Sequence, residues 1–187
     1  MAVKKPLAVY SGVEKELKAG DLIPSYLVAG LRNVYDSGTT GSTAEVLVTA
    51  IDISGLMGIN DSINIEVAFS WLFGGAATNS NVKIYLASGA TLAATKTLIF
   101  NQQASTQGVD RITQKFSNQG ATNSQYIWYA AQTGTTYQCW GNVTATAIAD
   151  QTFDSKTSFY ILISAQRGNS GNRIIVKGID VTLNRVN

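Results

Sequence analysis

The chain has 187 residues, of which 45% are hydrophobic and 14% charged, with a formal net charge of +2, no histidine and one cysteine. This length suits one packed domain with an extension, and the hydrophobic content excludes wholesale disorder. The lack of histidine excludes Ser-His-Asp and Cys-His catalysis, the single cysteine excludes an intramolecular disulfide, and the scattered basic residues argue against nucleic-acid binding.

Residues 1–41 are predicted to form an irregular arm, because prolines and glycines recur in this stretch and interrupt any long helix or strand. At most, residues 13–19 are expected to form one or two helical turns, with Ser11 as the N-cap and Gly20 as the stop. The arm carries too many apolar residues for a flexible linker. We therefore expect it to dock, either on a partner or on its own domain.

From Ser42 onward the pattern is that of a β-domain, predicted to span residues 42–187. The clearest strand is residues 62–71, where apolar and polar residues alternate over ten positions, which indicates one buried face and one solvent face. Residues 45–53 are strand-like without regular alternation. Other strand-like runs, separated by turn-forming residues, are residues 82–86, 92–100, 109–116, 143–148 and 175–183.

Two further strands, residues 126–130 and 159–163, are apolar on both faces. A strand in an antiparallel sandwich buries one face unless something covers the other. Either the arm or neighbouring subunits would provide the cover, and we favour a three-fold oligomer over packing wholly within one core. The residues predicted to lie at this oligomer interface are Tyr126, Trp128, Tyr160 and Leu162.

The predicted fold is all-β, because no convincing amphipathic helix separates the strands. About eight or nine strands in this length match a jelly-roll-like antiparallel β-sandwich, with an immunoglobulin-like sandwich as the alternative. No internal repeat with a period of 20–50 residues is evident, which argues against a propeller or a solenoid.

Catalysis, a cofactor and a metal are not expected. A carboxylate pair could still hydrolyse glycans, since that chemistry needs only two suitably spaced acids. Asp150 and Asp154 bracket a loop-like stretch, where turn-forming aspartates are the simpler interpretation and the oxygen ligands are too few for calcium. The glycine-containing stretches 38–41 and 168–171 lack the ending of a phosphate loop and are predicted to be turns.

Five aromatic residues lie close together in the sequence: Tyr126, Trp128, Tyr129, Tyr137 and Trp140. Aromatic platforms hold sugar rings, but core or interface packing is the favoured interpretation. Cys139 is expected to be a buried structural thiol. The N-terminus lacks the apolar segment of a signal peptide, and no run of about 18 apolar residues occurs. Synthesis in the cytoplasm is therefore expected, without membrane insertion.

The N-terminal sequence resembles the short leader of many tailed-bacteriophage virion proteins. Residues 6–12 read Pro-Leu-Ala-Val-Tyr-Ser-Gly and residues 17–21 read Leu-Lys-Ala-Gly-Asp, which fit a Pro-Leu-x-x-Tyr-Ser-Gly and Leu-x-x-Gly-Asp pattern. Residues 97–100, and 158–172 leading into 174–186, are similar to the ending of small phage β-domains found on heads, necks and tail fibres.

This resemblance implies a structural role on the outer surface of a virion, with the leader attached to the particle and the β-domain packed as a homotrimer. The partners would be capsid or other virion proteins. The residues expected to anchor the chain are Pro6, Leu7, Val9, Tyr10, Leu17, Leu22 and Ile23.

The chain is short and has no long shaft repeats, which departs from a typical tail fibre and favours capsid decoration, cement or a short head fibre. A tail-fibre or collar subunit is the close alternative. A module that recognises host glycans, and a carboxylate-based glycan hydrolase, are the other candidates.

Overall fold

The computed structural model describes residues 7–10, 13–16, 25–38, 42–74, 79–104, 107–128 and 153–186, and all regular elements in these ranges are β-strands. The strands are β1 (Leu7–Tyr10), β2 (Val13–Glu16), β3 (Ser25–Asp36), β4 (Val46–Asp52), β5 (Ser62–Phe73), β6 (Ser80–Ala87), β7 (Lys96–Ala104), β8 (Gly108–Asn118), β9 (Gln125–Trp128), β10 (Tyr160–Gln166) and β11 (Asn172–Asn184). The all-β expectation is confirmed.

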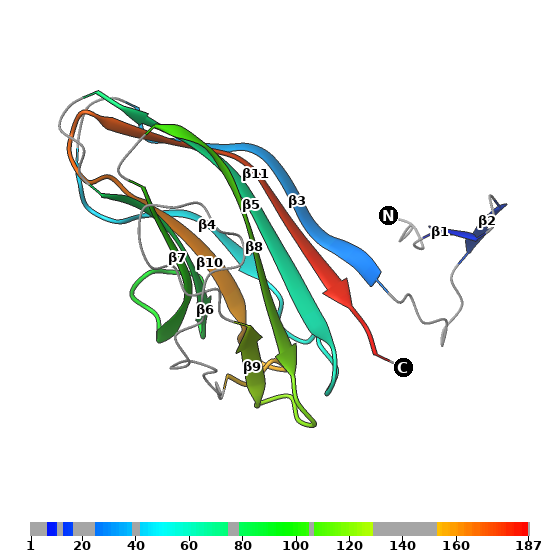
Figure 1. The fold of residues 1–187 in the computed structure, drawn as a ribbon. Coiled ribbons are helices and arrows are strands. Elements are labelled where there is room, and N and C mark those ends of the chain that lie inside the picture. Colours follow the sequence, from blue (N-terminus) through cyan, green and yellow to red (C-terminus); the bar gives the residue numbers. More distant parts are fainter. Residues whose placement is uncertain are drawn as a thin grey trace, which may run out of the picture.

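Nine of these strands form two antiparallel sheets that pack face to face, and β1 and β2 form a separate hairpin (Figure 1). The five-stranded sheet has the order β3-β11-β5-β8-β9, and the four-stranded sheet has the order β4-β10-β6-β7. The last two strands insert between earlier ones: β10 lies between β4 and β6, and β11 lies between β3 and β5. Apart from the short strand β9, this is the two-sheet strand order of a jelly roll. The predicted jelly-roll-like sandwich is therefore confirmed by topology.

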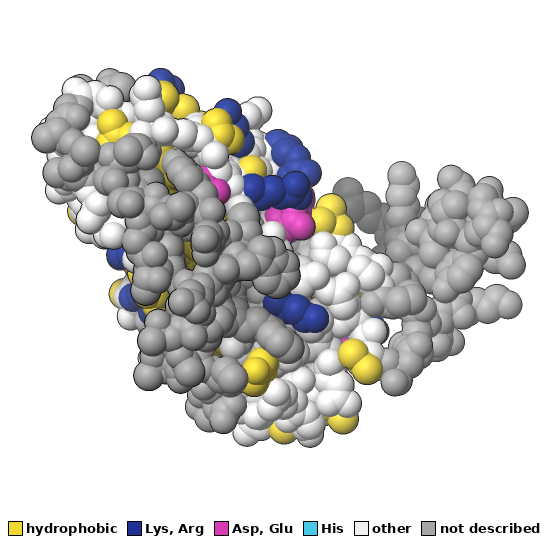
Figure 2. All heavy atoms as spheres, in the orientation of Figure 1, with side chains coloured by type: hydrophobic (Ala, Val, Ile, Leu, Met, Phe, Trp, Pro, Cys, Tyr) yellow, Lys and Arg dark blue, Asp and Glu magenta, His cyan; other side chains and the backbone are white. Residues whose placement is uncertain are grey.

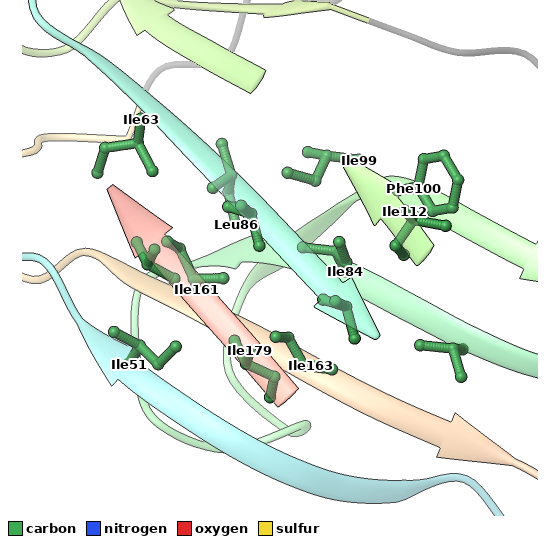
Figure 3. Packing of buried hydrophobic residues seen from close by; sticks show 14 of the residues in the cluster. Ile51, Ile63, Ile84, Leu86, Ile99, Phe100, Ile112, Ile161, Ile163 and Ile179 are labelled. Atoms are coloured by element: carbon green, nitrogen blue, oxygen red, sulfur yellow. The ribbon is translucent and has the colours of Figure 1, made fainter. Parts of the chain in front are cut away.

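The core fills the space between the two sheets, and β5 shows how the sequence builds it. Its alternate residues, from Ile63 to Trp71, are almost completely buried, as the alternation predicts. They pack against residues from the opposite sheet, including Ile84 of β6 and Ile161 of β10 (Figure 3). Burial of such a continuous apolar layer is the main stabilising contribution in a sandwich.

Strand β3 corrects the predicted start of the β-domain. Residues 25–36, assigned to the arm by the sequence pattern, pair along β11 at the edge of the five-stranded sheet. The sequence pattern does not indicate this strand, because Gly30 and Asn33 are both poor strand residues. The register with β11 shifts twice along β3, once at residues 33–34 and once at Val28, and Asn33 has a positive φ of 52°. A Cβ on Gly30 would lie 2.9 Å from Leu27 Cδ2, so the side chain of Leu27 occupies that space.

Two smaller expectations also change, and the irregular strand predicted at residues 45–53 is confirmed as β4. Val13–Glu16 is a strand paired with β1, not a helical turn. Strand β7 begins at Lys96 rather than residue 92, because residues 88–95 form the loop to β6. The poor alternation of residues 45–53 has a physical cause: the register between β10 and β4 shifts at Ile163/Ser164, which changes the face on which the following β4 residues lie. Residues 143–148 lie outside the described part of the chain.

Buried polar side chains join the loops at one end of the sandwich. Asn118 donates to the Gly58 carbonyl at 2.7 Å and to Ser155 Oγ at 3.0 Å, and it accepts from Gln125 Nε2 at 3.0 Å. Asp61 accepts from the backbone N–H groups of Gly58 and Val186. These bonds connect the C-terminal end of β11 to the loops after β4 and β8. They are expected to persist, because a buried polar group is costly to leave unpaired.

At the opposite end, the buried guanidinium of Arg167 donates to backbone carbonyls. Its Nη2 lies 2.7 Å from the carbonyl oxygen of Ser42 and its Nη1 lies 3.2 Å from that of Ser170. Asn169 Oδ1 accepts from the N–H groups of Gly171 and Asn172, which forms the turn predicted at residues 168–171. Arg167 thus fixes the chain that enters β4 to the loop between β10 and β11.

Candidate interaction surfaces

The expected anchoring residues divide between a described hairpin and the rest of the N-terminal segment. Leu7, Val9 and Tyr10 belong to β1, which pairs antiparallel with β2 from Leu7↔Glu16 to Tyr10↔Val13. Among the described strands, β1 and β2 pair only with each other. The other anchoring residues, Pro6, Leu17, Leu22 and Ile23, lie outside the described residues.

The expected oligomer-interface residues lie on opposite sides of the sandwich. Tyr126 of β9 alternates with Ile127, which is buried in the core, so Tyr126 is on the outer face of the five-stranded sheet. Tyr160 and Leu162 alternate with Ile161 and are on the outer face of the four-stranded sheet. The side chain of Trp128, like Tyr129, Tyr137, Cys139 and Trp140, lies outside the described part. Tyr126 therefore does not share a surface with Tyr160 and Leu162.

The outer face of the four-stranded sheet carries a second apolar cluster. Leu162, Tyr85 and Ala87 are buried there, and Leu162 is 0% exposed although it faces away from the main core. Partly buried residues from β4, β10 and the β6–β7 loop pack against them: Leu47, Ala50, Tyr160 and Leu92. The double apolar character of residues 159–163 thus corresponds to two apolar layers, one on each face of β10.

Glu45, just before β4, forms the polar continuation of this cluster. Its Oε1 accepts from Tyr85 Oη at 2.7 Å and from Ser164 Oγ, and its Oε2 accepts from Lys83 Nζ at 3.2 Å. Lys83 Nζ also donates to Gln166 Oε1 at 3.0 Å. The carboxylate thereby connects the start of β4 to β6 and β10.

The electrostatics of this group follow from its partners. Burial alone would raise the pKa of Glu45, but the hydrogen bonds from Ser164, Tyr85 and Lys83, together with the charge of Lys83, lower it below its usual value. Burial and the hydrogen bond to the Glu45 carboxylate raise the pKa of the Tyr85 phenol. The group is therefore ionised at Glu45 and neutral at Tyr85 near neutral pH.

The outer face of the five-stranded sheet carries a row of charges instead. Asp180 of β11 and Glu66 of β5 are register partners in the middle of the sheet. Arg32 Nη1 donates to Asp180 Oδ1 at 2.8 Å, and Arg111 Nη2 pairs with Glu66 on the other side. Figure 2 shows Lys and Arg side chains, with acidic ones beside them, along the side of the molecule where Figure 1 places β3, β11 and β5.

A further ion pair lies near the end of this face. Arg173 Nε donates to Asp36 Oδ1 at 2.8 Å, and its Nη2 bonds the other carboxylate oxygen. The hydrogen bond from Arg173 and the one from the Gly38 N–H lower the pKa of Asp36 to about 2. Because both partners are substantially exposed, solvent screens this pair.

Several acidic side chains that the structure describes have structural partners. Asp180 and Glu66 are adjacent, but each is ion-paired with an arginine. Asp154 accepts from the Lys156 N–H at 3.0 Å, as expected of a turn residue, and Asp150 lies outside the described residues. Burial raises the pKa of Asp110, whose carboxylate accepts from the Arg111 N–H. Within the described ranges, no group of three or more His, Cys, Asp or Glu residues could hold a metal ion, and no helix could cross a membrane.

Comparison with known proteins adds a weak likeness. No protein-family model and no curated protein sequence matches the chain. A crystal structure of the infectious bursal disease virus particle is 9% identical, with a TM-score of 0.33, and the match covers 97% of this chain and 44% of that chain. A VP2 subviral particle of the same virus is 8% identical, with a TM-score of 0.29, over 97% of this chain and 46% of that chain.

This chain therefore spans less than half the length of the viral chains that it resembles. With TM-scores this low, the assignment of the jelly-roll fold rests on the strand order of the two sheets.

Proposed function

We propose that this chain is a non-enzymatic structural protein of a tailed-phage virion, which decorates or stabilises the capsid as an arm-anchored trimer. The observation that carries the proposal is the leader-like sequence of residues 6–21, part of which forms a hairpin outside both sheets of the jelly roll. A jelly roll is also a common architecture of viral capsid domains, although lectins and cupins share it.

The placement of the apolar outer residues is compatible with a trimer. A cyclic trimer is built from heterologous contacts, in which one surface of a subunit meets a different surface of the next. Tyr126 on one outer face and the partly buried Tyr160 on the other would supply two such different surfaces. Three arms on one trimer would then raise the avidity for the particle without requiring a strong single contact.

Deletion of residues 1–24 tests the role of the arm. This deletion keeps β3 and both complete sheets, whereas deletion to residue 41 would remove β3 and expose β11. We expect the truncated chain to keep its melting temperature and its trimeric mass in analytical ultracentrifugation, but to lose co-sedimentation with phage particles that lack this protein.

Deletion of residues 1–5 is the matched control, because it removes Lys4 and Lys5 but keeps the leader from Pro6 onward. This shorter deletion should bind particles normally. Retained binding by the chain without residues 1–24 would refute attachment through the arm.

The alternative location is the tail or collar, where the same fold could serve as a fibre subunit or a glycan-binding module. Binding to a glycan array that disappears when Tyr126 is replaced would favour the glycan-binding module over capsid decoration.

A further inference from the structure

The hairpin β1–β2 is too short to be stable by itself. Each strand has four residues, about 13 Å of extended chain. An isolated two-stranded hairpin is at best marginally stable in water, and a third strand or a packing partner is usually required. The described strands of this chain do not supply a third strand.

The register of the hairpin defines which backbone groups point away from it. Tyr10 and Val13 are the closing pair and are separated by two residues, and in such a hairpin the closing pair is hydrogen-bonded. Bonded and non-bonded pairs alternate along an antiparallel ladder. Ala8 and Lys15 therefore form a bonded pair, whereas the N–H and C=O groups of Leu7 and Val9 face outward from β1.

The two outer edges of the hairpin differ in charge. By the same alternation, the outer edge of β2 belongs to Glu14 and Glu16, with Lys15 between them. Charged residues are a common means by which proteins protect a strand edge from pairing. The sequence of β1 is Leu-Ala-Val-Tyr, which is uncharged and favourable for a strand.

We propose that β1 binds the particle by adding the hairpin to an unpaired strand edge of a capsid protein. The contact is made through the backbone of Leu7 and Val9, and β2 lies on the outer side of the extended sheet. Main-chain hydrogen bonds give the affinity in this mode of recognition. The inference rests on the proposed function, and it specifies the edge and the backbone groups that make the contact.

The test uses the full-length chain with phage particles that lack it. Val9→Pro removes an outward N–H while leaving the pairing of Ala8 and Tyr10 with β2, and Glu14→Pro removes the equivalent N–H on the other edge. We expect binding of the Val9→Pro chain to be at least about tenfold weaker, because a backbone donor is lost in each arm of the trimer. The Glu14→Pro chain should bind within about twofold of the unaltered chain.

Val9→Ala separates the backbone from the side chain, because it shortens the side chain and keeps the N–H. It should bind more tightly than Val9→Pro. Hydrogen exchange gives an independent measurement, since the amides of Leu7 and Val9 should become protected when the unaltered chain binds particles.

The outcomes distinguish the two proposals. If the unaltered chain does not bind particles, the proposed function fails and this inference fails with it. If it binds, but Val9→Pro binds equally well or Glu14→Pro is the variant that loses binding, only the β1 edge is wrong. A third outcome is that Val9→Pro abolishes self-association of the chain but leaves particle binding unchanged. The hairpin would then pair with a second copy of this chain, and the inference would be overturned.

Discussion

The outer face of the five-stranded sheet carries exposed ion pairs, whereas that of the four-stranded sheet carries buried apolar and polar contacts. On the five-stranded sheet, Asp180 and Glu66 occupy adjacent positions and are neutralised by exposed arginines. On the four-stranded sheet, Leu162 is fully buried and Glu45 is held by groups from β6 and β10. Exposed ion pairs contribute little to stability, whereas buried apolar and polar contacts contribute much more. The four-stranded side should therefore behave as a second, smaller core.

The largest expected difference comes from matched leucine substitutions on the two faces. Leu162→Ala should lower the free energy of unfolding by about 2–5 kcal/mol, because it leaves a cavity beside Tyr85 and Ala87. Leu72→Ala, on the outer face of the five-stranded sheet at 42% exposure, should lower it by about 1 kcal/mol or less. Urea unfolding of both variants measures this difference. Equal losses would mean that the two outer faces are energetically alike.

Matched glutamate substitutions should give a smaller difference in the same direction. Glu45→Ala removes the acceptor for Tyr85 and Ser164, both of which are buried, and should lower the free energy of unfolding by about 1–3 kcal/mol. Glu66→Ala removes only an exposed ion pair and should lower it by about 0–1 kcal/mol. The same chemical unfolding experiment reports both values, and a larger loss in Glu66→Ala would reverse the comparison.

The pH dependence of stability should sharpen the comparison further. The folded pKa values of Glu45 and Asp36 lie below their values in the unfolded chain, and that of Asp36 is about 2. Their stabilising contributions are therefore complete above the unfolded pKa and are lost as the pH falls through the folded pKa. We expect the free energy of unfolding to decrease from about pH 5 to about pH 2.

Substitution identifies the source of that decrease. Glu45→Gln and Asp36→Asn should each make the decrease in unfolding free energy shallower, because neither side chain titrates. Added salt should reduce the contribution of the exposed Asp36 pair more than that of the partly buried Glu45 group. A Glu45→Gln curve parallel to that of the unaltered protein would show that Glu45 does not contribute to the pH dependence.

The strands were predictable from the sequence wherever one face of the strand is buried and the other faces solvent. Residues 62–71 alternate cleanly, and β5 has the expected burial. Strand β3 is not evident in the sequence because Gly30 and Asn33 weaken its strand pattern, and its register shifts, one of them at Asn33, arise from pairing with β11. Such tertiary pairing is not visible in a local window of sequence.

The interaction surfaces were only partly predictable, for a related reason. The apolar pattern of residues 159–163 correctly indicated a strand with two apolar faces. It did not indicate that Tyr126 and Leu162 would lie on different sheets, because alternation specifies the two faces of one strand and not the sheet that the strand joins. The polar group around Glu45 was not predicted, since its members come from β6, β10 and the residue before β4, which are distant in sequence.

Electron cryomicroscopy of intact particles tests the central claim most directly. The account predicts jelly-roll density, in groups of three, at repeated positions over the outer surface of the phage head. Density restricted to the neck or tail would contradict capsid decoration and favour a collar or fibre subunit. Absence of the chain from purified particles would contradict a structural role in the virion altogether.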